Sequence, residues 1–185
     1  MAPAASATPA HAPAPTPVSA HTPASTATAS AAIAAHGAHG PRMQWAKLAP
    51  EVFKAMNALD RAARKGLDPA LVELVRIRAS QLNRCGYCLN LHAQDALKAG
   101  ETVERVYLLS AWEEAGAYYT PKEQAALALT EAVTVLTDGF VPDAVYQRAA
   151  EHFEDAELAH LIAVINTINA WNRFGVTTRR APGQE

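Results

Sequence analysis

The sequence contains only two cysteines in 185 residues, and they lie at positions 85 and 88. Secreted proteins that depend on disulfide bonds carry more cysteines and spread them along the chain. The scarcity of cysteine therefore excludes a disulfide scaffold. It indicates instead that Cys85 and Cys88 form a chemically active pair in a protein of a reducing compartment.

Long apolar runs and an excess of positive charge are also absent. No stretch approaches the roughly 20 consecutive apolar residues of a membrane span, and no Lys/Arg-rich segment precedes an apolar one, as in a signal peptide. The formal net charge is −2, without a basic stripe to neutralise nucleic-acid phosphates. We therefore expect a cytoplasmic protein that binds neither membranes nor nucleic acids.

Residues 1–41 lack charged side chains and are rich in Ala, Pro, Ser and Thr. The repeated prolines prevent a continuous helix, and almost nothing large is available to bury. We predict a disordered tail over residues 1–42, then one helical domain over residues 43–181, and we take Met43 as a candidate natural start. The spacing of the four tail histidines is irregular and favours an incidental origin over a metal site: His11, His21, His36 and His39.

From Trp45 onward, apolar residues recur at the three- and four-residue spacing of helices, and no segment alternates like a strand. The sequence therefore predicts an all-α fold, a compact bundle of about six or seven helices. Caps and breaks place these helices over residues 50–65, 69–82, 87–98, 101–115, 121–136, 143–153 and 155–172.

Cys85 and Cys88 begin the third predicted helix, where a thiolate is stabilised. The thiolate is the nucleophilic form of cysteine, and the unpaired N–H groups and dipole at a helix start favour this anion. His92 follows Cys88 by four residues and Cys85 by seven, so the three side chains share one helix face. The spacing predicts that Cys88 and His92 act as a nucleophile and its base.

Glu73 is an acidic residue on the largely apolar second helix. If helices two and three form an antiparallel pair joined near residues 83–85, Glu73 lies roughly 15 Å before the turn and His92 roughly 11 Å after it. A side chain or one water molecule spans that difference. We therefore predict that Glu73 orients His92 and accepts its proton, as a third group does in catalytic triads.

Two other interpretations of the cysteine pair are open. A structural zinc site would need His92 and a fourth ligand, but the spacing of His152 and His160 matches no zinc motif. Alternatively, both cysteines are inert core residues, since cysteine is often buried. For Glu73 the alternative is a solvated charge. We favour the redox dithiol because of the register of His92, and we predict no metal and no other cofactor.

Other polar and aromatic residues of the helices have structural interpretations. Three asparagines interrupt the apolar last helix and either face solvent or, as we favour, form hydrogen bonds at a subunit interface: Asn166, Asn169 and Asn172. Three tryptophans are expected to anchor the core or an interface: Trp45, Trp112 and Trp171.

The pattern Glu-x11-Cys-x2-Cys-x3-His, from Glu73 to His92, resembles the alkylhydroperoxidase D-like (AhpD-like) group of the carboxymuconolactone decarboxylase superfamily. The likeness extends over roughly residues 43–179. It includes the segments LVELVRIRASQLNRCGYCLNLHAQDALKAGE, LLSAWEEAGAYYTPKEQAALALTEAVT and INAWNRFGV.

The resemblance implies a role for each site residue. Cys88 would attack the peroxide and become a sulfenic acid, and Cys85 would condense with it to a disulfide. Glu73 and His92 would form the proton relay, through a water. One position departs from the family's pattern, because well-studied relatives carry His between the cysteines where this chain has Tyr87. A phenol does not replace an imidazole as a proton carrier near neutral pH.

The function predicted is that of a thiol-dependent (alkyl hydro)peroxidase or disulfide oxidoreductase in antioxidant defence. Its expected partners are a hydroperoxide substrate, a dithiol electron donor and further copies of the chain, since the family forms trimers or hexamers. The alternative is a redox sensor, in which the same dithiol switches an interface without turnover. Lactone decarboxylation is disfavoured, because the decarboxylase branch normally lacks the cysteine pair.

Overall fold

The computed structural model of the protein describes residues 40–183, so the predicted tail lies outside the described residues except for its last three positions. Within this part the chain forms α-helices and two short 3₁₀ turns, without a strand, which confirms the all-α prediction. The helices are α2 (Trp45–Leu48), α3 (Pro50–Ala63), α4 (Pro69–Leu82), α5 (Gly86–Lys98), α6 (Val103–Leu108), α7 (Pro121–Thr134), α8 (Asp143–Ala150) and α9 (Asp155–Thr178). The turns span Leu109–Ala111 and Gly116–Tyr118.

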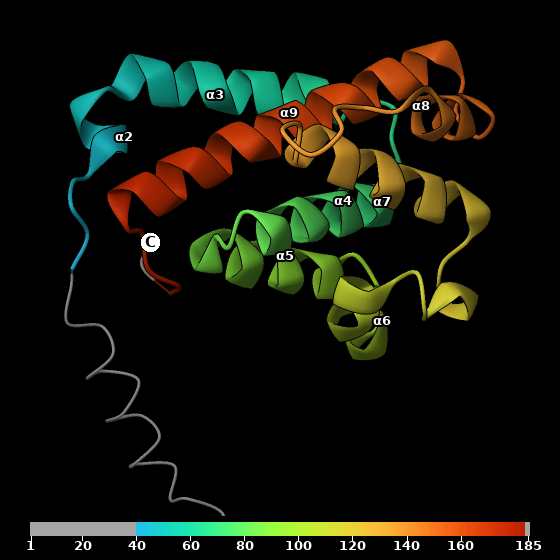
Figure 1. Ribbon diagram of the computed structural model, residues 1–185. Coiled ribbons are helices and arrows are strands. Elements are labelled where there is room, and N and C mark those ends of the chain that lie inside the picture. Colours follow the sequence, from blue (N-terminus) through green and yellow to red (C-terminus); the bar gives the residue numbers. More distant parts are fainter. Residues whose placement is uncertain (1–39, 184–185) are drawn as a thin grey trace, which may run out of the picture. The chain divides into compact units, whose positions relative to one another are not determined.

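Helix α4 occupies the centre of the bundle. It packs against α5, α7 and α9, and α3 lies along α9 on the other side (Figure 1). A helix surrounded by neighbours must be apolar on most of its circumference, and the apolar residues of α4 are buried: Leu71, Val72, Leu74, Val75, Ile77 and Ala79. The polar side chains of α4 are therefore few, and those that are buried need partners.

Helix starts follow the signals in the sequence. Asp68 caps α4 by accepting a hydrogen bond of 2.9 Å from the Leu71 backbone N–H, with Pro69 in the first turn. Thr120 and Glu123 form the predicted capping box at the start of α7. The N-cap of α9 is Glu154, so the helix begins at Asp155, where the sequence predicted its start.

Several helices end at other residues than predicted, and two of them differ most. Helix α9 continues to Thr178, six residues past its predicted end at Asn172, because its last turns still pack inward: the Phe174 ring stacks on Trp45 at 3.9 Å. The helix predicted over residues 101–115 is α6 followed by a 3₁₀ turn. In a 3₁₀ turn residues three apart face the same way, which buries both Leu109 and Trp112.

None of the described helices is both long enough and apolar enough to cross a membrane. The cytoplasmic location remains a prediction from the sequence.

Candidate active site

A Schellman-type turn places the cysteines at the junction of α4 and α5. Arg84 adopts the left-handed conformation, with φ of 54°, and its N–H bonds to the Gln81 carbonyl while the Cys85 N–H bonds to the Ser80 carbonyl. Cys85 is therefore the N-cap of α5, and its sulfur accepts a hydrogen bond of 3.4 Å from the Cys88 backbone N–H. The two sulfurs are joined in a disulfide.

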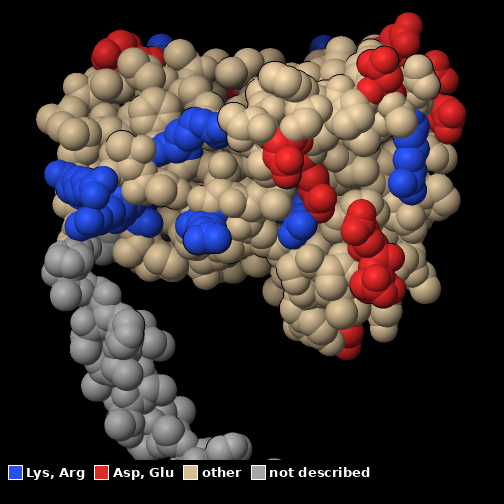
Figure 2. Space-filling view, viewed as in Figure 1, with Lys and Arg blue, Asp and Glu red and all other residues tan. Residues whose placement is uncertain are grey.

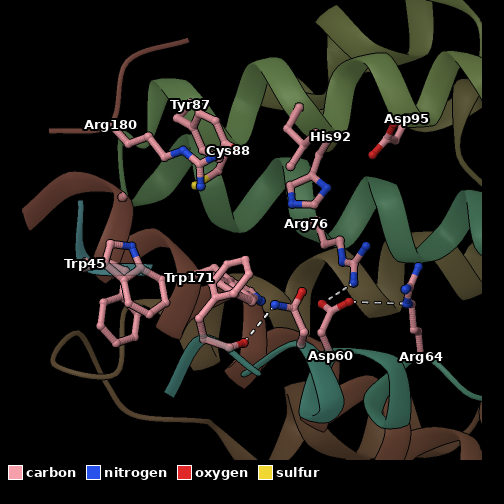
Figure 3. Close-up of a pocket in the computed structure, with 15 residues that line it drawn as sticks. Trp45, Asp60, Arg64, Arg76, Tyr87, Cys88, His92, Asp95, Trp171 and Arg180 are labelled. Carbon is pink, nitrogen blue, oxygen red and sulfur yellow. Dashed lines mark hydrogen bonds and ion pairs between the residues drawn. The ribbon is translucent and has the colours of Figure 1, made fainter. Parts of the chain in front are cut away.

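The two cysteines differ in their relation to the pocket beside them. A pocket of about 310 Å³ lies between α3, α5 and α9, and Cys88 lines it whereas Cys85 does not. Both cysteines are buried, with total exposures of 2% for Cys85 and 4% for Cys88. A small molecule that enters the pocket therefore meets Cys88 first. His92 lines the same pocket from the same helix, as Figure 3 shows.

Glu73 and His92 are in direct contact. Nδ1 of His92 lies 2.8 Å from Oε2 of Glu73, and both residues are 8% exposed. The antiparallel pairing of α4 and α5 that the sequence predicted is confirmed, and no bridging water is needed between these two groups. Among the described residues, no hydrogen bond joins the His92 ring to either sulfur, so a substrate or a water molecule must complete that part of a relay.

The carboxylate of Glu73 lies between two donors. Its other oxygen, Oε1, accepts a hydrogen bond of 2.9 Å from Arg76 Nη1, and Arg76 also pairs with Asp60 on α3 (Figure 3). An ionised carboxylate can only accept, so His92 Nδ1 must carry the proton. In the neutral imidazole, Nε2 is then unprotonated and free to act as a base. Sequence reasoning missed Arg76 and Asp60.

Aromatic side chains form the wall opposite α5. Trp45, Phe53, Trp171 and Phe174 line the pocket and contact one another at ring-centroid distances of 3.9 to 5.9 Å. Two of the tryptophans expected as anchors therefore also line the pocket. At the cysteine end, the Arg180 guanidinium lies 3.9 Å from the centre of the Tyr87 ring.

Gly175 of α9 faces the disulfide. A Cβ atom at this position would lie 2.9 Å from the Cys85 sulfur and 3.4 Å from the Cys88 sulfur. The first distance is shorter than real contacts allow, so only glycine fits here without movement. A glycine inside a helix signals close approach of another group, but the predicted end of the last helix at Asn172 left Gly175 outside it.

We predict that Gly175→Ala destabilises the oxidised protein. The bonded sulfurs cannot rotate away from the new methyl group, so α5 and α9 must separate, at a cost of about 1–3 kcal/mol. The reduced protein loses less, because a free Cys85 side chain can turn aside. Chemical denaturation of both redox forms measures the difference.

Gly116→Ala is the matched control, since its Cβ would meet its nearest atom at 3.7 Å, an ordinary contact. Equal stability changes in the oxidised and reduced forms of Gly175→Ala would contradict the proposed clash with the disulfide.

Two of the three asparagines of α9 are buried behind the cysteines. Asn172 is fully buried and donates to Ser80 Oγ at 2.9 Å, while Asn83 donates to the side-chain oxygens of Asn169 and Asn172. The expectation of a solvent or subunit-interface position is therefore wrong for Asn169 and Asn172, which bind α9 to the end of α4 within one chain. Asn166 is exposed.

One group of residues has the spacing of a metal site. Ligand atoms of Glu73, His92 and Asp95 lie within 4.8 Å of one another. A cation there would have to compete with the Arg76 guanidinium for Glu73. In the described part of the chain the cysteines join no such group, and His160 bonds to the Ala63 carbonyl instead, which disfavours the zinc site built on Cys85 and Cys88.

Comparison with known proteins gives one family. A model of the carboxymuconolactone decarboxylase family matches residues 50–132, from α3 into α7, a range that contains all four predicted site residues. The uncharacterized protein YdfG of Bacillus subtilis is 38% identical over 136 residues, which cover 73% of this chain and 92% of YdfG. The uncharacterized protein YnjA of Escherichia coli is 29% identical over 111 residues, 60% of each chain.

Two crystal structures are similar. One is a protein of unknown function from Agrobacterium tumefaciens, a candidate antioxidant defence protein AhpD, with 33% identity and a TM-score of 0.75 over 79% of this chain and 100% of that one. The other is an uncharacterized peroxidase-related protein from Silicibacter, with 19% identity and a TM-score of 0.62 over 72% of this chain and 71% of the other. The second likeness concerns the fold alone.

Proposed function

The chain belongs to the carboxymuconolactone decarboxylase family and is AhpD-like within it, and from this membership and the dithiol site we propose that it is a thiol-dependent hydroperoxidase. It reduces an organic hydroperoxide at Cys88 and is regenerated by a dithiol donor. The observation that carries the proposal is that Cys88, alone of the two cysteines, shares a pocket with His92.

The reaction begins with the reduced dithiol. His92 Nε2 takes the proton of the Cys88 thiol through a water molecule, and the thiolate attacks the outer oxygen of the hydroperoxide. The O–O bond breaks, the alcohol leaves with a proton from the imidazolium, and Cys88 becomes a sulfenic acid. The Cys85 thiol then attacks the sulfenic sulfur, which forms the disulfide and releases water.

The donor reverses the oxidation by thiol–disulfide exchange. Its thiolate attacks the sulfur of Cys88, which faces the pocket, and Cys85 leaves as a thiolate. The Cys88 N–H that bonds to the Cys85 sulfur at 3.4 Å favours this leaving group. The second donor thiol completes the exchange, so one hydroperoxide and one dithiol yield an alcohol, water and a donor disulfide.

Steady-state turnover is the direct test. We expect purified protein with excess dithiothreitol to consume cumene hydroperoxide over many cycles. The concentration of remaining peroxide measures this turnover. A single stoichiometric oxidation that stops would favour the alternative, a redox sensor switched by the same dithiol. No loss of thiols at all would contradict both functions.

We also propose that the chain acts as a homo-oligomer. Exposed apolar side chains on α2 and α3 support this, since Leu48, Val52 and Leu59 are 73%, 40% and 50% exposed in the single chain. Light scattering of the purified protein tests the proposal, and a monomer at micromolar concentration would contradict it.

A further inference from the structure

We propose that the hydroperoxide taken by this pocket carries an anionic group, a carboxylate on an aromatic or aliphatic body, and that Arg180 binds it. The inference rests on the proposed peroxidase function and names its substrate class. Three observations carry it: the pairing of charges in the pocket, the aromatic wall, and the place of Arg180 beside the cysteines.

The charges around the pocket are paired except at Arg180. Asp60 pairs with both Arg64, at 3.4 Å, and Arg76, at 2.5 Å. The remaining carboxylate of the lining, Asp95, pairs with Lys98 at 2.8 Å. Within residues 40–183, by contrast, no carboxylate lies within ion-pair distance of Arg180. Among the described residues that line the pocket, Arg180 is therefore the one charged side chain without an ion-pair partner, and its charge is positive.

Arg180 is held in place at the reactive end of the pocket. Its backbone N–H bonds to the Gly175 carbonyl at 3.0 Å, and its guanidinium stacks on Tyr87, the neighbour of Cys88. Stacking restrains the side chain while its N–H groups stay free to bind. A guanidinium presents paired donors that match a carboxylate.

The remainder of the lining suits an apolar body. Trp45 and Trp171 lie across the pocket from α5 (Figure 3), and Phe53 and Phe174 complete the aromatic lining. The volume of about 310 Å³ is that of a small-ligand pocket. A hydroperoxide that places its body on this wall and its carboxylate on Arg180 holds its O–O bond near Cys88. Tyr87 thus contributes the platform on which Arg180 rests.

The charge distribution over the surface agrees with an anionic ligand. Lys and Arg side chains gather at the end of the molecule where α2 and the C-terminal end of α9 lie, whereas most Asp and Glu side chains of this face lie over the opposite half (Figure 2). An anion is therefore attracted towards the end that holds the pocket, an effect that added salt screens.

The test compares two hydroperoxides that differ by one carboxylate group. Cumene hydroperoxide is neutral, and its para-carboxy derivative carries a carboxylate at neutral pH. With dithiothreitol as the common donor, we expect wild type to prefer the carboxylate in kcat/KM by roughly ten-fold, the scale of a partly exposed charged hydrogen bond. Arg180→Gln should bring that ratio to about one, and Arg180→Lys should restore part of it.

Arg179→Gln is the matched control, since it removes the same charge from the adjacent, exposed residue that does not line the pocket. The control should keep the wild-type ratio. An equal loss for both peroxides in Arg180→Gln would overturn the inference, because Arg180 would then act on the thiolate or the fold. Wild type without a preference would also overturn it, while turnover of cumene hydroperoxide would leave the proposed function intact.

A binding measurement separates the two proposals if turnover fails. The fluorescence of Trp45 and Trp171 should report binding of 4-isopropylbenzoate to the oxidised protein, about ten-fold tighter than binding of the corresponding neutral amide. This preference should disappear in Arg180→Gln. Equal affinities for acid and amide would overturn the inference whatever the enzyme assay shows.

Discussion

Cys88→Ser should abolish consumption of peroxide, with a residual rate indistinguishable from that of dithiothreitol alone. A serine hydroxyl is not deprotonated by an imidazole at neutral pH to the extent that a thiol is, and it forms no sulfenic acid. The substitution is nearly isosteric at a site that is 4% exposed, so the fold should persist. Peroxide loss followed with excess dithiothreitol measures the effect.

Cys85→Ser is the matched variant, because it removes the other sulfur of the same disulfide. Its Cys88 should still attack peroxide, but the sulfenic acid has no partner and should accumulate or form a mixed disulfide with the donor. Mass spectrometry after dimedone treatment should detect one adduct, on Cys88. Full activity in both variants, or an adduct on Cys85 in the Cys88→Ser protein, would refute the assigned roles.

Glu73→Gln should lower kcat/KM by about 10²–10⁴-fold, although the side chain keeps its size. Glu73 accepts from both Arg76 and His92, whereas an amide has one accepting and one donating end. The accepting end will face the cationic Arg76, so the NH₂ group will face His92 Nδ1. The imidazole must then carry its proton on Nε2, and the nitrogen towards the pocket no longer accepts one.

The control for this variant is Glu131→Gln. Glu131 is also shared by two donors, Arg78 Nε at 2.7 Å and Trp112 Nε1 at 2.6 Å, but lies outside the pocket lining. Glu131→Gln should lower the free energy of unfolding by about as much as Glu73→Gln does, but it should leave kcat/KM unchanged. His92→Ala should lower kcat/KM to a similar extent, because it removes the proposed base itself. Unchanged values of kcat/KM in both Glu73→Gln and His92→Ala would show that Glu73 and His92 have only a structural role.

The sequence was sufficient to predict the helical fold and the closeness of Glu73 to His92. Apolar spacing and caps predict helices reliably, and two antiparallel helices joined by a tight turn have a nearly fixed register, which is why Glu73 and His92 meet. The Arg76–Asp60 pair was beyond such reasoning, because Asp60 lies on α3. The angle at which α3 crosses α4 depends on packing that no local pattern records.

The pocket wall could not be predicted for a similar reason. Trp45 lies near the start of the helical domain, whereas Trp171 and Arg180 lie in and just after the last helix. Their approach depends on α9 extending past Asn172. Asparagines in an apolar helix suggested an exposed or interfacial face. The structure instead satisfies Asn169 and Asn172 inside the bundle, which the pattern of one helix cannot reveal.

These buried amides also determine which of several apolar packings the chain adopts. An apolar helix that is displaced along its axis by one turn, about 5.4 Å, still buries its apolar stripe. The displacement therefore costs little of the free energy gained by apolar burial. The same displacement of α9 would separate Asn172 from Ser80 and Asn83, at roughly 1–3 kcal/mol for each amide left unpaired. The amides thus widen the energy gap between the native alignment and its neighbours. Only in that alignment does Gly175, the one position of α9 without a side chain, lie opposite the disulfide.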